Sequence, residues 1–437
     1  MSDALKILLV GGGGREHALA WKIRQSPRCA ELWASDVSNP GLAALAQPCP
    51  VAVDAKELFP LRRWCEVNRI GLVVIGPEEP LAAGLADALA VPVVHGGPVP
   101  MVFGPVKAAA QLESDKAFAK ELMRSASIPT AEARTFTDAA GAIAYLESRN
   151  EPHVIKAAGL AKGKGVFVPA TMAEARAAVE RIMVHREFGD AGRTVVIEER
   201  LKGREVSVFA LIDGRNIYIL EACQDHKRLG DGATGPNTGG MGSLCPTPAV
   251  DDRLLARVQR EVLVPTVDAL RRDHIEFRGV LYAGLMLTHA GPKVLEYNVR
   301  FGDPECQTLM RRWRGDLVDA LTATATGRLE DVQIGWDQRP AVCVVLASPG
   351  YPDAPKTGAP IDGLEEAGQV EGVQVFLAGA KRDPGTGRVV TAGGRVLSVT
   401  AVGDNPEDAR RRAYRAAELI RFPGKQVRTD IGTDVVG

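Results

Sequence analysis

The chain has 437 residues, 46% of them hydrophobic and 24% charged, with a formal net charge of −1. This length predicts two to four domains, and the balanced charge argues against broad electrostatic attraction to nucleic acid or to an anionic membrane. The seven scattered cysteines lack a CxxC pair, and the apolar run near the N-terminus is too short for a signal peptide or a membrane span. We therefore expect a soluble, cytoplasmic, multidomain protein.

The first hundred residues alternate short strands with helices, an order typical of a parallel sheet built from βαβ units. A helix over residues 16–26 is predicted to follow the first strand. The predicted strands are residues 6–11, 31–36, 72–78 and 91–96. Prolines and glycines between 98 and 105 mark a boundary, so we expect a Rossmann-like domain over residues 1–105.

The rest of the chain is predicted to form two further α/β domains, over residues 106–334 and 335–437. The larger one is expected to contain a nested lid at about 126–196. It is also expected to contain a long glycine-rich loop over roughly 225–245. Because long loops in compact domains are usually functional or disordered, and predicted strands closely flank this one, we interpret it as functional.

Two glycine-rich turns are candidate phosphate sites. LLVGGGGREHA places Gly13 between a strand and a helix, where backbone N–H groups can approach a phosphate, but its spacing does not match G-x-G-x-x-G because residue 16 is Glu. AKGKGV, residues 161–166, follows a strand that carries Lys156 and lacks the Walker P-loop spacing. An alternative stays open for each stretch. The first is then a tight strand–helix turn that needs glycine only for close packing, and the second is a surface loop with solvated lysines.

Acidic residues follow two other predicted strands. In IEERLKGRE, residues 197–205, they can receive adenine and ribose hydroxyls, although an acidic surface strand has the same pattern. In VLEYNVRFGDPEC, residues i and i+2 share a face, so Val294, Glu296, Asn298 and Arg300 are expected to line one side of a strand. A carboxylate and an amide oxygen in adjacent positions suit a partly hydrated Mg²⁺; a solvated strand face is the alternative.

Eight stretches, taken together and in order, make the chain resemble the phosphoribosylamine–glycine ligases, or glycinamide ribonucleotide synthetases, of the ATP-grasp superfamily. The resemblance covers essentially the whole chain. The stretches are GGGGREHA, IGPEEPL, SDKAF, IKAAGLAKGKGV, QDHKRLGDGATGPNTGGMG, YAGLM, EYNVRFGDPE and TAGGRVLSVTA.

The resemblance implies an α/β architecture: an ATP-grasp fold with an N-terminal Rossmann-like parallel-sheet domain, a nested lid and a small C-terminal α/β domain. It implies ATP-dependent ligation of glycine to 5-phospho-D-ribosylamine through glycyl phosphate, giving glycinamide ribonucleotide, ADP and phosphate in de novo purine biosynthesis. The cofactors implied are ATP and Mg²⁺ or Mn²⁺. The partners are expected to be small-molecule substrates, with no nucleic acid and no membrane, in a monomer or weak homodimer.

Site residues follow from the same resemblance, position by position. It assigns the ATP phosphates to Lys116 and Lys156, and a mobile flap over them to Gly163, Lys164 and Gly165. It assigns adenine and ribose to Glu198, Leu201 and Glu205, and the metal to Glu296 and Asn298. Arg300 is expected to steady the acyl phosphate, and we hypothesise that glycine and phosphoribosylamine are positioned by Asp225 and Lys227 together with residues 237–242. The remaining substrate-binding residues are expected to be Gly13, Arg15, Glu78, Asn237, Gly240 and Asp303.

Three residues depart from the pattern of the family beside the nucleotide and substrate loops, where they are expected to affect nucleotide affinity: Ala158, Lys162 and Ala233. Two alternatives to the ligase stay open, another ATP-grasp carboxylate–amine ligase or carboxylase and a non-catalytic nucleotide-binding regulator. The stretch QDHKRLGDGATGPNTGGMG argues against the first. The intact lysines and the Glu296–Asn298 pair argue against the second.

Overall fold

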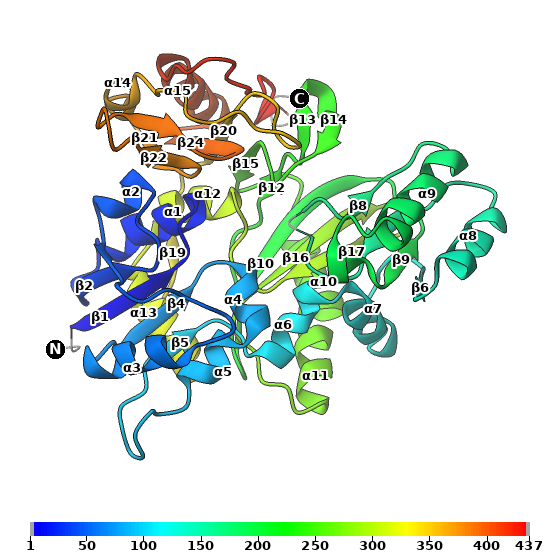
Figure 1. Ribbon diagram of the computed structural model, residues 1–437, viewed down its shortest axis with the longest axis horizontal. Coiled ribbons are helices and arrows are strands. Elements are labelled where there is room, and N and C mark those ends of the chain that lie inside the picture. Colours follow the sequence, from blue (N-terminus) through cyan, green and yellow to red (C-terminus); the bar gives the residue numbers. More distant parts are fainter. Residues whose placement is uncertain (1–3, 162, 434–437) are drawn as a thin grey trace.

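The protein is described by a computed structural model over residues 4–161 and 163–433, so Lys162 lies outside the described residues. Figure 1 shows three masses around a centre: the blue N-terminal part at the left, the orange and red C-terminal part at the top, and an elongated green and cyan part at the right. Within the described part of the chain, no helix is long and apolar enough to cross a membrane.

The N-terminal part is a five-stranded parallel sheet in the order β3-β2-β1-β4-β5. Its central strands are continuous apolar runs that are buried on both faces, as expected when helices cover both sides of a parallel sheet. The strands are β1 (Leu5–Val10), β2 (Cys29–Ala34), β3 (Gln47–Pro48), β4 (Leu72–Ile75) and β5 (Met101–Phe103). The helices are α1 (Gly14–Ile23), α2 (Pro40–Ala43), α3 (Phe59–Val67), α4 (Glu78–Ala83) and α5 (Leu85–Leu89).

The strand predicted at 91–96 is wrong. This segment has no regular structure, and the side chains of Val91 and Val94 are more than half exposed. The last strand is β5 instead, which pairs with β4 from Met101 onwards. Pro92 removes a backbone N–H that a ladder needs within this segment, and Pro98 and Pro100 follow shortly after it.

The middle of the chain forms a four-stranded antiparallel sheet in the order β11-β10-β16-β17. Its hairpin β16–β17 turns at 289–291, as predicted. The strands are β10 (Arg204–Asp213), β11 (Ile217–Ile219), β16 (Arg278–Thr288) and β17 (Gly291–Asn298). The helical segments around it are α6 (Lys107–Ser114), α7 (Lys116–Ser125), α10 (Asp252–Val258), η4 (Gln259–Leu263), α11 (Val264–Arg272), α12 (Glu305–Arg312), α13 (Leu317–Thr326) and η5 (Leu329–Asp331).

The part at the right of Figure 1 is a smaller sheet in the order β6-β9-β7-β8. It has its own apolar cluster, in which Ala142, Ala175 and Ile182 pack from the helices against the sheet. The strands are β6 (Ala133–Phe136), β7 (Val154–Ala157), β8 (Val166–Phe167) and β9 (Val195–Glu198). The helical segments are α8 (Ala139–Glu147), α9 (Met172–Val179), η1 (Glu180–Val184) and η2 (Gly189–Gly192).

A five-stranded sheet in the order β12-β15-β20-β24-β21 corrects the loop predicted over 225–245. Half of that stretch is strand, and β15 pairs along its whole length with β20 of the C-terminal part. The strands of this sheet are β12 (Gln224–Asp225), β15 (Gly242–Cys245), β20 (Ala341–Ala347), β21 (Val373–Leu377) and β24 (Arg395–Val402). Separate two-stranded sheets pair β13 (Arg228–Gly230) with β14 (Thr234–Asn237), β18 (Trp313–Arg314) with β19 (Gly335–Trp336), and β22 (Ala380–Arg382) with β23 (Val389–Thr391). The helical segments are η3 (Asp231–Ala233), α14 (Leu364–Gly368) and α15 (Pro406–Leu419).

Candidate active site

A bulge in β17 aims the acid–amide pair out of the core. Gly284 pairs with Glu296, but its neighbour Leu285 pairs with Val294, so Leu295 is an extra residue in the ladder. Val294 therefore packs in the same apolar cluster as Tyr297 and Val299. The expectation that Val294 shares a face with Glu296, Asn298 and Arg300 is wrong, because one extra residue reverses the alternation.

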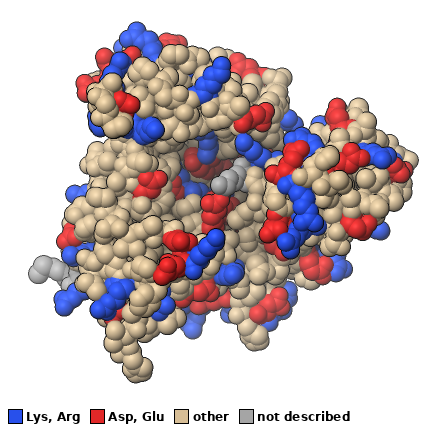
Figure 2. Space-filling view, viewed as in Figure 1, with Lys and Arg blue, Asp and Glu red and all other residues tan. Residues whose placement is uncertain are grey.

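The two predicted phosphate lysines lie beside this strand. The Lys156 Nζ donates to the Leu295 carbonyl oxygen at 2.9 Å, and the Lys116 Nζ donates to the Gly159 carbonyl oxygen at 3.3 Å. The charge of Lys227, opposed by burial and joined by the charges of Lys156 and Lys116, lowers the pKa of Glu296 to about 2. The lysines and the acid–amide pair thus share one region. In the space-filling view, basic and acidic side chains gather in a hollow between the three masses (Figure 2).

Glu198 is buried between two lysines. Its carboxylate forms an ion pair with Lys156 and a second one, at 2.6 Å, with Lys120. Burial raises the pKa of Glu198, but the two ammonium groups outweigh burial and leave the pKa below its usual value. The Glu198 side chain therefore faces Lys120 and Lys156, the second of which is one of the two predicted phosphate lysines. Leu201 lies just past the strand end and is half-buried.

The predicted flap is anchored at one end. Gly165 is buried and its carbonyl oxygen accepts from the Ala157 N–H at 2.8 Å. Gly163 and Lys164 are exposed, and a Cβ at Gly163 would meet nothing within 4 Å. Ala158, one of the three departures, accepts the Lys116 N–H at 2.8 Å. A loop pinned beside the phosphate lysines and open at its tip suits a cover for a phosphate chain.

Lys227 links the glycine-rich stretch to β17. Its Nζ lies 3.0 Å from the Glu296 Oε1 and 3.6 Å from the Glu205 Oε2. Burial alone lowers the pKa of Lys227, but Glu296 and Glu205 together raise it well above its ordinary value. Lys227 therefore stays charged, and it holds Glu205 and Glu296 on either side of one ammonium group.

Asp225 lines a small cavity next to this cluster. Among the described residues, its buried Oδ1 has no hydrogen-bond partner. The cavity, about 10 Å³ in volume, is lined also by Ser207, Lys227 and Tyr282, and such a volume holds about one water molecule. Burial, followed by the charge of Glu305, raises the pKa of Asp225 well above its ordinary value. A cationic group in this cavity would be electrostatically favourable.

The raised pKa of Asp225 predicts a pH-dependent stability difference. A carboxyl whose pKa is higher in the folded state stabilises the fold below its unfolded pKa of about 3.9, and this contribution is lost as the pH rises towards the folded pKa. Thermal unfolding of the parent and of Asp225→Asn from pH 4 to pH 8 is therefore expected to favour the variant increasingly as the pH rises. A difference in melting temperature that is constant with pH would contradict this.

Arg300 is held by two carboxylates. Its Nη2 donates to the Glu113 Oε1 at 2.7 Å and to the Asn298 Oδ1 at 3.3 Å, and its Nε lies 3.4 Å from the Glu78 Oε2. Burial disfavours the charge of Arg300, but Glu113 and Glu78 outweigh burial and raise its pKa. Arg300 is therefore a fixed cation beside Asn298.

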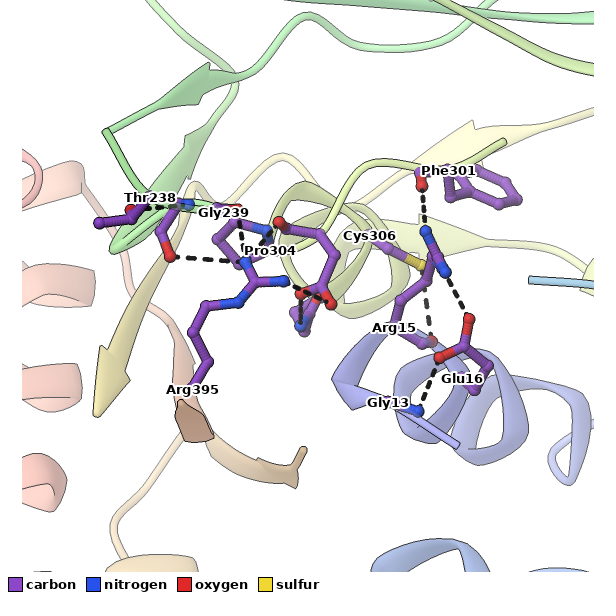
Figure 3. A network of polar contacts seen from close by, with 12 residues as sticks. Gly13, Arg15, Glu16, Thr238, Gly239, Phe301, Pro304, Cys306 and Arg395 are labelled. Atoms are coloured by element: carbon purple, nitrogen blue, oxygen red, sulfur yellow. Dashed lines mark hydrogen bonds and ion pairs between the residues drawn. The ribbon is translucent and has the colours of Figure 1, made fainter. Parts of the chain in front are cut away.

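Gly13 and Arg15 lie at the start of α1, and their donors already have partners (Figure 3). The Gly13 N–H donates to the Glu16 Oε2 at 2.8 Å, and the Arg15 Nε donates to the Glu16 Oε1 at 2.7 Å. The Arg15 Nη1 donates to the Phe301 carbonyl oxygen at 3.2 Å. A Cβ on Gly13 would lie 4.0 Å from the Asp303 Oδ2, so the first turn of α1 and the loop after β17 meet here.

Arg395 of β24 joins the other predicted substrate residues (Figure 3). Its Nη1 donates to the carbonyl oxygens of Gly239 and Asp303 at 2.5 and 2.6 Å, and its Nη2 lies 3.0 Å from the Asp303 Oδ2. Gly240 is buried beside them, and Asn237 ends β14. The C-terminal part thus contributes a guanidinium to the site.

Gly240 is expected to tolerate no side chain. Its φ is +109°, and a Cβ would lie 2.6 Å from the Pro304 Cδ and 2.7 Å from the Asp225 Oδ1. Gly240→Ala is expected to cost about 1–3 kcal/mol from overpacking in addition to backbone strain, which a lower melting temperature would reveal. Gly232→Ala is the control, because Gly232 also has a positive φ but open space around its Cβ. Equal melting temperatures for the two variants would contradict the steric argument.

Sequence reasoning missed several residues of this site. They are Glu113, Lys120, Glu305 and Arg395. Glu113 immediately precedes SDKAF, and Lys120 lies one turn beyond Lys116. Arg395 lies within TAGGRVLSVTA, one of the eight stretches on which the family resemblance rests, so that stretch was the available signal for it.

The donor set fits a hard cation held partly by protein. Glu296 is ionised, and Asn298 offers an amide oxygen on the same face of β17. Among the described residues, no group of three or more His, Cys, Asp or Glu side chains is placed to hold a metal ion. Mg²⁺ commonly uses one or two protein oxygens with phosphates and water as its other ligands, so the pair is sufficient for that kind of site.

Comparison with known families matches nearly the whole chain. The N domain of phosphoribosylglycinamide synthetase matches residues 5–113, its ATP-grasp (A) domain 114–306 and its C domain 341–434. Two relatives are described as phosphoribosylamine–glycine ligases. The one from Rhodopirellula baltica is 49% identical, covering 97% of this chain and 96% of its own. The one from Caulobacter vibrioides is 50% identical, covering 98% of each.

Solved structures give a consistent result. The crystal structure of phosphoribosylamine–glycine ligase from Thermotoga maritima has a TM-score of 0.81 at 33% identity and covers 98% of this chain and 100% of its own. A biotin carboxylase from Campylobacter jejuni, in a β-γ-ATP complex, has a TM-score of 0.70 at 14% identity, covering 99% of this chain and 95% of its own. The second likeness shows the fold alone.

Proposed function

Since the chain belongs to the phosphoribosylglycinamide synthetase family, and so catalyses the ATP-dependent ligation of glycine to phosphoribosylamine in purine biosynthesis, we propose that β17 and the lysines beside it form its reaction centre. Its fold is the α/β ATP-grasp fold with a parallel-sheet N-terminal domain and a C-terminal domain. The observation that carries the proposal is the meeting of Lys116, Lys156, Lys227 and Glu296 in one electrostatic cluster.

The first half-reaction makes glycine's carboxylate a competent acyl donor. A carboxylate oxygen leaves poorly until it carries a phosphoryl group, and phosphoryl transfer needs positioning and charge neutralisation more than a protein nucleophile. In our proposal Lys116 and Lys156 neutralise the phosphates of ATP, and Gly163, Lys164 and Gly165 cover them. Glu198, Leu201 and Glu205 receive the nucleoside.

Glu296 and Asn298 would hold Mg²⁺ or Mn²⁺, which supplies charge neutralisation at the phosphate oxygens when bound. Two features support this part of the proposal: the lowered pKa of Glu296, which keeps its carboxylate ionised, and the amide oxygen of Asn298 on the same face of β17. In our proposal Arg300, whose Nη2 donates to the Asn298 Oδ1, steadies the acyl phosphate. Glu78, its second carboxylate partner, then stands at the edge of the phosphoribosyl site.

The second half-reaction needs an amine and glycyl phosphate held together. We infer that Asp225 receives the ammonium group of glycine, because its buried Oδ1 lacks a donor among the described residues. Lys227, Asn237, Gly240 and Asp303 shape the surrounding loop. The phosphoribosyl part would lie by Gly13 and Arg15 at the N-terminal end of α1, where backbone dipoles favour a phosphate.

The same proposal also covers the domain boundaries, the oligomeric state and the location of the protein. We propose domains over residues 1–105, 106–334 and 335–437, with a lid at about 126–196 that includes the separate small sheet. We propose a monomer or weak homodimer that acts on small molecules alone. We also propose the cytoplasm as its location, in line with seven cysteines that are all free.

An assay of phosphate release tests the site. Release is expected to require ATP, a divalent metal, glycine and phosphoribosylamine together, which separates this ligase from other ATP-grasp ligases and from a non-catalytic regulator. Asn298→Ala is expected to raise the metal concentration needed for half-maximal rate about 10- to 100-fold. Unchanged metal dependence in Asn298→Ala would contradict the metal assignment.

A further inference from the structure

Glu113 is a buried carboxylate outside the set of residues discussed for the reaction. It lies on α6, and its side chain is only 7% exposed. A buried carboxylate is costly unless both oxygens are paired. In Glu113 they are, because Oε2 accepts the Val299 N–H at 2.8 Å and Oε1 accepts from the Arg300 Nη2 at 2.7 Å.

These two bonds act at the point where β17 ends. The ladder with β16 runs as far as Asn298, which pairs with Tyr282, and Val299 is the next residue. The Glu113 carboxylate thus receives the first backbone N–H beyond the ladder. It fixes the chain directly after the acid–amide pair and before the loop that carries Asp303.

The same carboxylate sets the direction of Arg300. The Arg300 Nη2 is shared between the Glu113 Oε1 and the Asn298 Oδ1, which forms a chain of three side chains. Glu78 approaches Arg300 from another side, at 3.4 Å, and its side chain is 25% exposed. Glu113 is therefore the buried anchor of Arg300, and Glu78 its more exposed partner.

We propose that Glu113 is a positioning residue of the ligation. By accepting hydrogen bonds from both the Val299 N–H and the Arg300 guanidinium, it fixes the positions of Arg300 and of the Asn298 Oδ1 relative to the substrates. This inference rests on the role proposed above for Arg300. Glu113 touches no reacting atom and acts through Arg300, so its removal affects turnover more than the affinity for ATP.

Glu113→Gln is the sharpest test, because it keeps the shape of the side chain but replaces one acceptor with a donor. Its kcat is expected to fall at least about tenfold, while the KM for ATP stays within about twofold, and Glu113→Asp, which keeps the charge, is expected to recover part of the rate. Glu121→Gln is the matched control, since Glu121 forms an exposed ion pair with Arg124 on the next helix. The control is expected to keep the parent kcat.

A second readout separates positioning from folding. Positional isotope exchange in ATP with glycine reports reversible glycyl phosphate formation, and its rate is expected to fall in parallel in Glu113→Gln and Arg300→Lys. The double variant is expected to lose much less than the product of the two single losses. Glu113→Asp supplies these measurements if the glutamine variant does not fold.

The outcomes distinguish the two proposals. If Arg300→Lys slows the exchange but Glu113→Gln and Glu113→Asp keep the parent kcat, the positioning role is overturned and the role of Arg300 stands. If Arg300→Lys keeps the parent rate, the role of Arg300 itself fails, and the positioning role fails with it. A lowered melting temperature with an unchanged kcat would make Glu113 purely structural.

Discussion

Glu296→Gln is expected to lower kcat by about 10²–10³-fold, because it removes the negative charge that faces the lysines and that we propose binds the metal. Glutamine keeps the shape and one oxygen, so the loss reports charge rather than packing. The measurement is ADP release under saturating substrates, together with Mn²⁺ binding by electron paramagnetic resonance. Mn²⁺ binding in the presence of ADP is expected to weaken in parallel with the rate.

Glu261→Gln is the control for this variant. Glu261 also forms an ion pair with a basic side chain, at 2.8 Å from Arg257, but on a helix outside the site. It is expected to keep both the rate and the Mn²⁺ binding of the parent. A Glu296→Gln enzyme with parental Mn²⁺ binding would remove the metal from this strand.

Lys156→Ala is expected to have the second-largest effect, on both stability and nucleotide affinity. It leaves the buried Glu198 with one of its two ammonium partners, and breaking a buried ion pair costs about 3–5 kcal/mol. We expect a loss near the lower end, about 3 kcal/mol, because Lys120 remains. The affinity for ADP is expected to fall on the order of tenfold to a hundredfold, the usual effect of a lost charge-assisted hydrogen bond.

Thermal unfolding and calorimetric titration with ADP check the two parts separately. Lys6→Ala is the control, because the Lys6–Glu31 pair is partly exposed at 3.0 Å; exposed pairs contribute at most about 1 kcal/mol. An Lys156→Ala protein that binds ADP like the parent would place the phosphates elsewhere. If Lys156→Ala had the same melting temperature as the parent, Lys120 alone would be a sufficient ion-pair partner for the buried Glu198 carboxylate.

Much of the architecture follows from local patterns. Apolar runs such as residues 6–11, which lead directly into glycines, identify parallel strands, and the hairpin at 289–291 is a short-range signal. The strand expected at 91–96 fails because β-branched residues favour a strand only where they are buried in one. That burial depends on partners far away in the sequence.

The site also divides into features that local sequence patterns predict and features that depend on contacts between distant residues. Glu296 and Asn298 are two residues apart, so their shared face of a strand was predictable, but the bulge at Leu295 was not, because it depends on the register with β16. Glu113 and Arg300 are 187 residues apart, and no local pattern marks such a contact. The strand character of 242–245 was hidden for the same reason, since its partner β20 begins about a hundred residues later.

The seating of β15 in the C-terminal sheet has a consequence for dissecting this enzyme. A truncation that removed everything after residue 335 would strip β15 of its partner β20 and would also delete Arg395. The severed fragment would expose an apolar edge prone to self-association. The last hundred residues therefore complete a sheet that begins in the middle of the chain, and they are not expected to behave as a detachable module.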